Sequence, residues 1–131
     1  MKRCAVIVDD NRALAEDLGE ILHSEGFDVR VFFDPVVASQ TCDGLNFQLA
    51  LLDVRMPGMD GVELYRVLSR KHPGAHFILM SAYADDRRLK QALDEGVTRI
   101  LTKPLSVPEL VKLVQNVVDT EDVPVGSGGS T

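Results

Sequence analysis

The chain has 131 residues, a net charge of −6 and a pI of about 4.9, and 45% of its residues are hydrophobic. This length suits one domain with a core of its own, and no apolar run reaches the roughly 18 residues that a membrane helix needs. Because an acidic chain repels phosphate backbones, the composition argues against direct nucleic-acid binding.

The N-terminal apolar run, Cys4–Val8, is too short for a signal peptide and meets Asp9 and Asp10 at once, so we expect a cytosolic protein that does not enter a membrane. From the first predicted strand, at Ala5–Val8, the apolar period alternates between that of a strand and that of a helix. The elements predicted next are a helix carrying Leu14 to Leu22 and ended by Gly26, a strand at 28–33, a short helix at 36–43, a strand at 49–52, a helix from Leu64 to about His72, a strand at 77–80, a helix at 85–95 ended by Gly96, a strand at 98–102 and a last helix with an apolar stripe from Val107 to Val118.

Five strand–helix repeats predict an α/β fold in which helices cover both faces of a parallel sheet. Right-handed crossovers leave a few doubly wound arrangements, in which the ligand site lies at the carboxyl ends of the strands. We expect the domain to span residues 1–120, and residues 121–131, rich in glycine and serine, to form a flexible linker or an added tail.

Polar residues stand where four of these strands end: Asp9 and Asp10 after the first, Asp53 after the third, Ser81 after the fourth and Lys103 after the fifth. Three converging carboxylates repel one another, and a hard cation such as Mg²⁺ relieves the repulsion through oxygen ligands. Phosphoryl transfer needs mostly positioning and charge neutralisation, and a carboxylate is an established nucleophile. The constellation therefore favours phosphoryl chemistry at this edge.

The same strand ends carry four recognisable segments, which are Val8–Asn11, Leu52–Gly61, Met80–Tyr83 and Leu101–Leu105. In these segments, and in their order, the chain resembles the response-regulator receiver family of two-component signalling over about residues 3–119. The resemblance implies a flavodoxin-like doubly wound sheet of five parallel strands in the order 2-1-3-4-5, with helices on both faces. It also implies a signalling switch that catalyses only its own phosphorylation and dephosphorylation, not a conventional enzyme.

The resemblance assigns roles to the strand-end residues. Asp53 accepts the phosphoryl group from a phosphohistidine, Ser81 hydrogen-bonds that group once it is formed, and Lys103 pairs with one of its oxygens. The Lys103–Pro104 bond resembles the family's cis peptide, which would direct Lys103 into the site. The implied cofactor is Mg²⁺, held by Asp10, by one oxygen of Asp53 and by the backbone carbonyl of Arg55, with Asp9 acting through a bridging water.

The expected switch and modulatory positions are Arg55, Ala82, Tyr83, Ile100 and Pro104. Many receivers carry an aromatic residue where Ile100 stands, and isoleucine cannot repeat a ring rotation. A switch would then run through the loop that holds Tyr83. We hypothesise that the large side chains of Arg55 and Tyr83 hinder the water that hydrolyses an acyl phosphate.

The implied partners are a sensor histidine kinase or phosphotransfer protein, and an output domain or partner protein that contacts the face formed by the fourth helix, the fifth strand and the fifth helix. Leu113, off the predicted apolar stripe, is either a scattered surface residue or part of a partner or homodimer surface there. Alternative functions are a phosphorylation-independent binding module, a Mg²⁺-dependent aspartyl phosphatase and a flavin carrier.

Several residues also have a purely structural interpretation. Asp10 and Asp60 are each candidates for a helix N-cap, which we prefer for Asp60 alone. Cys4 and Cys42 lack a CxxC spacing, so we expect two thiols and no redox pair. The three histidines, predicted to occupy helices or helix ends as surface or structural residues, are His23, His72 and His76.

Overall fold

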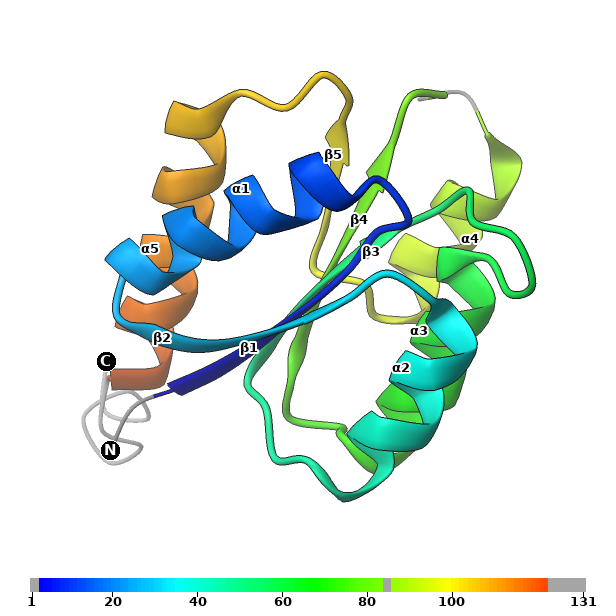
Figure 1. Cartoon of the computed structure of the whole chain (residues 1–131), viewed down its shortest axis with the longest axis horizontal. Helices are drawn as coiled ribbons and strands as arrows, with labels where there is room; N and C mark the ends of the chain where they lie inside the picture. Colours follow the sequence, from blue (N-terminus) through cyan, green and yellow to red (C-terminus); the bar gives the residue numbers. More distant parts are fainter. Residues whose placement is uncertain (1–2, 84–85, 123–131) are drawn as a thin grey trace.

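The computed structural model describes residues 3–83 and 86–122, with side chains as far as Val117. Strands and helices alternate along it (Figure 1) as β1 (Arg3–Val8), α1 (Arg12–Ser24), β2 (Phe27–Phe32), α2 (Pro35–Thr41), the 3₁₀ helix η1 (Cys42–Gly44), β3 (Leu49–Asp53), α3 (Gly61–Lys71), β4 (His76–Ser81), α4 (Arg87–Glu95), β5 (Arg99–Thr102) and α5 (Val107–Asp122). Helix α5 passes the predicted domain end at residue 120, and residues 123–131 of the predicted tail lie outside the described residues.

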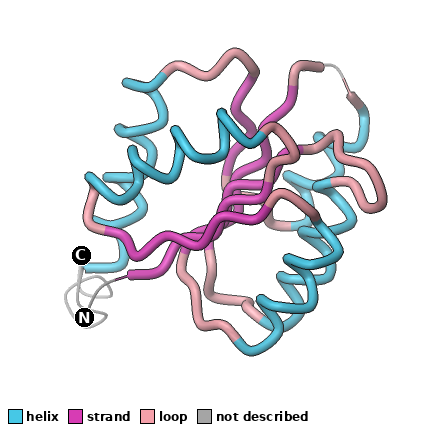
Figure 2. Tube along the Cα trace, viewed as in Figure 1, coloured by secondary structure: helices cyan, strands magenta, loops and turns pink. Residues whose placement is uncertain are grey.

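The strands form one parallel sheet in the order β2-β1-β3-β4-β5. Helices α1 and α5 cover one face, and α2, α3 and α4 cover the other (Figures 1 and 2). This arrangement confirms the predicted doubly wound fold. In the β1–β3 register Val8 lies opposite Leu52, so the residues that follow β1 lie beside Asp53. Among the described helices, none is both long enough and apolar enough to cross a bilayer.

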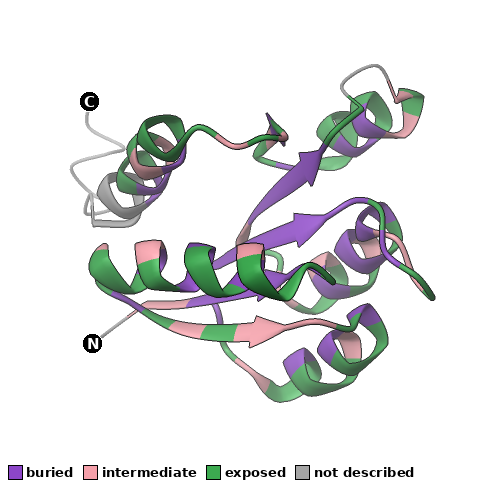
Figure 3. Cartoon of the chain, turned by 45° about the horizontal axis from the view of Figure 1, so that its top comes forward, coloured by how far each residue is buried: buried purple, intermediate pink, exposed green. Residues whose placement is uncertain are grey.

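The central strands are buried on both sides of the sheet (Figure 3). In β3, Leu49 and Leu51 pack into the core beneath α1 and α5, whereas Ala50 and Leu52 pack into the core beneath α2, α3 and α4. Burying one leucine side chain stabilises a fold by about 1.5–3 kcal/mol. The continuous apolar runs of the sequence therefore form the rigid part of the molecule, and the polar residues at their ends are held in place by it.

The predicted stripe of α5 is partly wrong. Leu110, Val114 and Val117 are buried, but Val107 is 49% exposed because it begins the helix, one turn before the first buried position. Leu113 was predicted to lie off the stripe, yet it is half-buried against the core shared with α1. The side chain of Val118 lies outside the described part of the chain.

Short polar side chains cap the helices. Asp60 forms a capping box with Glu63 at the start of α3, which confirms the preferred structural interpretation of Asp60. Asn11, not Asp10, caps α1. Helix α4 begins at Arg87, later than predicted, and Asp86 caps it by accepting a hydrogen bond from the backbone N–H of Arg88. Asp10 is thereby left without a capping role.

Gly61 sets how closely α3 approaches the end of β3. A Cβ atom at this position would lie within 2.9 Å of the Asp53 carbonyl carbon, closer than real Cβ atoms come to such neighbours. We predict that Gly61→Ala lowers the free energy of unfolding in urea by about 1–3 kcal/mol or more, because backbone must shift to admit the methyl group. Gly44→Ala is the control, since no heavy atom lies within 4 Å of its added Cβ. Equal losses in the two variants would contradict this steric account.

Candidate functional site

Three aspartates meet at the carboxyl edge of the sheet. Asp9 and Asp10 follow β1, and Asp53 is the last residue of the neighbouring strand β3. One oxygen from each carboxylate lies within 4.8 Å of the others. Asp9 is 0% and Asp53 5% exposed, whereas Asp10 is exposed. The predicted convergence is therefore present, with two buried carboxylates and one at the rim.

Lys103 enters the cluster from β5. Its Nζ lies 3.0 Å from Oδ2 of Asp9 and 3.1 Å from Oδ1 of Asp53. The other Asp9 oxygen accepts a hydrogen bond of 3.0 Å from the backbone N–H of Asn11. The peptide bond from Lys103 to Pro104 is cis, as the family resemblance implied. One ammonium thus binds two buried carboxylates that lie at the ends of different strands.

The charges at this edge do not balance. Burial, and then the neighbouring Asp9 carboxylate, raise the pKa of Asp53 from 3.8 to about 6, although Lys103 acts in the opposite direction. Burial lowers the pKa of Lys103, but its hydrogen bonds with Asp9 and Asp53 outweigh that effect and raise the pKa overall. Lys103 therefore remains charged near neutral pH, but its single positive charge does not fully neutralise the carboxylates around it.

Ser81 ends β4 with its side chain buried. Its Oγ accepts a hydrogen bond of 3.0 Å from the Tyr83 N–H and lies 3.3 Å from the Tyr83 carbonyl oxygen, to which the hydroxyl donates. Beside it, the Lys103 N–H donates to the Ser81 carbonyl oxygen at 2.8 Å. The hydroxyl thus links the strand edge to the loop that follows β4.

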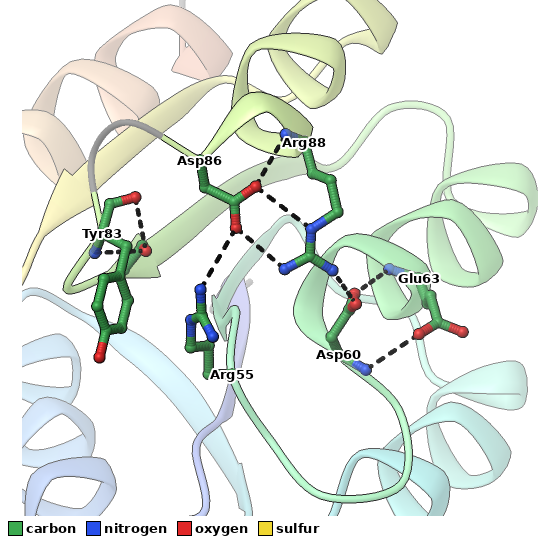
Figure 4. A network of polar contacts seen from close by, with 7 residues as sticks. Arg55, Asp60, Glu63, Tyr83, Asp86 and Arg88 are labelled. Atoms are coloured by element: carbon green, nitrogen blue, oxygen red, sulfur yellow. Dashed lines mark hydrogen bonds and ion pairs between the residues drawn. The ribbon is translucent and has the colours of Figure 1, made fainter.

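A second group of polar residues lies in the segments after β3 and β4 and at the starts of α3 and α4 (Figure 4). The Arg55 guanidinium carbon lies 4.2 Å from the centre of the Tyr83 ring, and Arg55 Nη2 lies 4.0 Å from Oδ2 of Asp86. Asp86 binds Arg88 through both of its oxygens, and Arg88 also pairs with Asp60. Sequence reasoning missed Asp86 and Arg88. The helix predicted at 85–95 placed Asp86 inside it, so the sequence pattern did not indicate even a cap at this residue.

The remaining predicted switch positions are Ala82, Pro104 and Ile100. Ala82 and Pro104 are exposed, and Ile100 is half-buried against the core beneath α3 and α4. Their assignment as switch positions stays a prediction.

The cysteines and histidines take structural places. Cys4 and Cys42 are free thiols, and burial raises the pKa of both, that of Cys42 to about 11, so neither favours a thiolate. His23 is exposed on α1, and His72 ends α3 with Nε2 2.9 Å from the Cys42 carbonyl oxygen. His76 begins β4, so its predicted helix-end position was wrong.

The donor set fits a hard divalent cation. Asp9, Asp10 and Asp53 supply carboxylate oxygens within a few ångströms, and Lys103 neutralises only part of their charge. Mg²⁺ takes oxygen ligands of this kind and keeps several waters, for which the exposed side of Asp10 leaves room. The residues present are therefore suited to the predicted ion.

Comparison with known proteins defines the family. The pattern of the response regulator receiver domain matches residues 5–115, so the chain belongs to this family. Over 108 residues it is 39% identical to the response regulator receiver protein Anae109_2439 of Anaeromyxobacter sp. (strain Fw109-5), with coverage of 82% of this chain and 45% of that protein. The chain spans about half the length of the curated relatives it matches.

Solved structures agree with this assignment. The CheY-like receiver domain protein of Methanospirillum hungatei JF-1 is 25% identical, with a TM-score of 0.87 and coverage of 93% of this chain and 98% of that one. The CheX–CheY–BeF3–Mg²⁺ complex of Borrelia burgdorferi contains a chain that is 27% identical, with a TM-score of 0.80 and coverage of 88% and 89%. The protein is thus a receiver domain of two-component signalling, a regulatory module.

The raised pKa of Asp53 leads to a prediction about stability. Because the folded state holds the Asp53 proton more tightly than the unfolded state, this residue lowers the free energy of unfolding as the pH rises from about 4 to above 6. Asp53→Asn should therefore stabilise the metal-free protein at pH 7 by about 1–3 kcal/mol, and by less as the pH falls. Urea unfolding in the presence of a chelator measures this difference.

Addition of Mg²⁺ serves as the control for this experiment. It should stabilise the original protein more than Asp53→Asn, because the amide is a poorer ligand than the carboxylate. A difference between the two proteins that does not change with pH would count against charge burial as its cause.

Proposed function

We propose that this receiver domain accepts a phosphoryl group on Asp53 from the phosphohistidine of a sensor histidine kinase or phosphotransfer protein, with Mg²⁺ as cofactor. One observation carries the proposal. The Lys103 ammonium lies 3.1 Å from a buried carboxylate whose pKa is raised to about 6, at a strand edge where two further aspartates stand. This is a nucleophile with positive charge beside it and oxygen ligands around it.

The chemistry is a displacement at phosphorus. A carboxylate oxygen of Asp53 forms the new P–O bond, the P–N bond to the donor imidazole breaks, and the imidazole nitrogen keeps the electron pair of that bond. Lys103 stays charged throughout and pairs with a phosphoryl oxygen. Ser81 donates its hydroxyl hydrogen to another oxygen, which requires the hydroxyl to leave the Tyr83 carbonyl that it binds in this structure.

Mg²⁺ would be held by Asp10, Asp53 and the backbone carbonyl of Arg55, with Asp9 acting through a water. When bound, the ion supplies positive charge that neutralises the phosphoryl oxygens and the carboxylates together. Asp9 is already engaged by Lys103 and by the Asn11 N–H, which leaves Asp10 as the carboxylate with the most freedom to bind a metal. The structural neighbour from Borrelia burgdorferi, solved with BeF3 and Mg²⁺, supports this assignment.

Phosphorylation acts on partners by changing a surface. The added group carries about −1.5 to −2 charges, which Lys103 and Ser81 bind only in the modified state. We place the output surface on the face of α4, β5 and α5, for an output domain, a partner protein or a second copy of the chain. The half-length match to curated relatives supports an output domain elsewhere in the full protein. The cytosolic location stays a prediction.

The alternative functions, a binding module and an aspartyl phosphatase, differ from a switch in how the protein treats a phosphoryl group. A binding module on the same fold needs no nucleophile, whereas here Asp53 is buried and paired with Lys103. An aspartyl phosphatase turns over small phosphomonoesters, and its Asp-x-Asp pattern after the first strand differs from the adjacent Asp9 and Asp10. A switch takes one phosphoryl group and keeps it for a time.

Acetyl phosphate with Mg²⁺ tests the proposal directly. We predict that intact-mass analysis shows the gain of one phosphoryl group, because the small donor needs only the nucleophile, the lysine and the metal. Asp53→Asn should gain none, and a chelator should abolish the gain in the original protein. A gain that survives Asp53→Asn, or steady turnover of a phosphomonoester, would refute the proposed function.

The lifetime of the phosphorylated state tests the role of Arg55 and Tyr83. Both are large, and their side chains stack at the rim of the site, where Tyr83 is 52% exposed. We predict that replacing both with alanine speeds phosphate loss by about tenfold, which corresponds to about 1.4 kcal/mol of barrier, because water reaches the acyl phosphate more easily. The time course of phosphate release after removal of the donor measures it. An unchanged rate would show that the pair does not shield the site.

A further inference from the structure

We propose that Asp86 is a positioning residue for Arg55: it holds the guanidinium beside the phosphorylation site and competes with a phosphoryl group on Asp53 for it. The proposal rests on the proposed function, because it needs a phosphoryl group on Asp53. It adds a residue from the start of α4 to the control of the site. It also supplies a connection between Asp53 and α4 that does not need an aromatic ring at Ile100.

The position of Arg55 is held by two weak contacts. Its guanidinium lies over the Tyr83 ring, with 4.2 Å from the guanidinium carbon to the ring centre, and Nη2 lies 4.0 Å from Oδ2 of Asp86 (Figure 4). The Arg55 side chain is 59% exposed. The Asp86 side chain is 12% exposed, but the pair is long and its Arg55 end lies in solvent, so it contributes little and Arg55 can leave Asp86 at small cost. The chain places Arg55 two residues after Asp53.

Asp86 does not depend on Arg55 in return. Its Oδ2 accepts a hydrogen bond of 3.0 Å from Arg88 Nη2, and its Oδ1 accepts one of 3.3 Å from Arg88 Nε. The same Oδ1 accepts the Arg88 N–H as the cap of α4. These contacts with Arg88, together with the nearby Arg55, lower the pKa of Asp86, so the carboxylate stays charged. When Arg55 departs, Asp86 keeps a bidentate partner and no charge is left unpaired.

A phosphoryl group shifts this competition. It brings about −1.5 to −2 charges to Asp53, against a single charge on Asp86 that Arg88 already binds. Arg55 therefore gains more from the phosphoryl oxygens than it loses at Asp86. Departure of Arg55 removes a positive charge from the carboxylate that caps α4. Since Arg88 also pairs with Asp60, the cap of α3, the change reaches the first turns of both helices.

Ile100 fits this interpretation. It is half-buried and packs against the core beneath α3 and α4, where an aliphatic side chain fills space. The contacts of Arg55, Tyr83 and Asp86 lie at the surface instead, in the loops after β3 and β4. A surface charge contact can respond to a new anion without any repacking of the core.

Asp86→Asn separates the positioning role from the helix cap, because asparagine caps helices as well as aspartate does. Loss of the competing charge should lengthen the phosphorylated state by about two- to fivefold, the range expected for one exposed ion pair. In an Arg55→Ala background the same substitution should change nothing, since the competing guanidinium is absent. Arg88→Gln leaves Asp86 with Arg55 alone and should shorten the lifetime.

The experiment uses the whole chain, phosphorylated with acetyl phosphate and Mg²⁺, with phosphate loss timed by intact mass after the donor is removed. The Nε–H signal of Arg55 in NMR spectra, identified by its loss in Arg55→Ala, should shift on phosphorylation. An Asp86→Asn effect of equal size with and without Arg55 would overturn the inference, as would no effect in either background. Failure of the unmodified chain to gain a phosphoryl group would instead overturn the proposed function, and the inference with it.

Discussion

The contact on which this receiver depends most is the Lys103 ammonium between Asp9 and Asp53. The two groups joined by the Lys103–Asp9 hydrogen bond stand 94 positions apart in the sequence, on strands that only the sheet order β1-β3-β4-β5 brings to one edge. Two buried carboxylates at that edge repel each other and resist burial. One lysine long enough to reach past β4 offsets part of both effects. The fold thus brings Lys103 close enough to reduce the repulsion between the carboxylates. The same ion pairs connect the end of β5 to the ends of β1 and β3.

The neutralisation of the carboxylates is incomplete, and the proposed function depends on this. One ammonium faces three carboxylates, and the pKa of Asp53 stays raised to about 6 even with Lys103 at 3.1 Å. A site with balanced charges would be more stable but would have less to gain from a cation or from an interaction with phosphoryl oxygens. Functional sites commonly give up stability in this way. Here the fully buried strand β3 carries the Asp53 carboxylate, whose pKa is raised.

The sequence allowed the strand-end residues to be predicted because their position follows from strand period alone. Asp9, Asp53, Ser81 and Lys103 each come where an apolar run stops, and parallel strands must end at the same edge. The strand order needed the family resemblance in addition. The exposure of Val107 could not be predicted, because helical period does not say where the packed part of a helix begins. The contact of Asp86 with Arg55 also escaped, since it depends on how two loops approach each other. The contacts of Asp86 with Arg88 are local, and they escaped because the helix was predicted to begin before Asp86.

The site therefore has two sides with different physical character. On the inner side Asp9, Asp53 and Lys103 lie at the ends of strands and are joined by contacts of 3.0 and 3.1 Å, which gives the proposed displacement at phosphorus a fixed geometry. On the outer side Arg55 and Tyr83 are exposed, and the Arg55 guanidinium is held only by contacts of 4.2 Å with the Tyr83 ring and 4.0 Å with Asp86. A switch needs both sides. The chemistry requires a fixed geometry, whereas the response requires an element with two conformations that differ little in free energy. Because Ile100 packs against the core, the proposed response lies on the outer side, where Arg55 can leave Asp86.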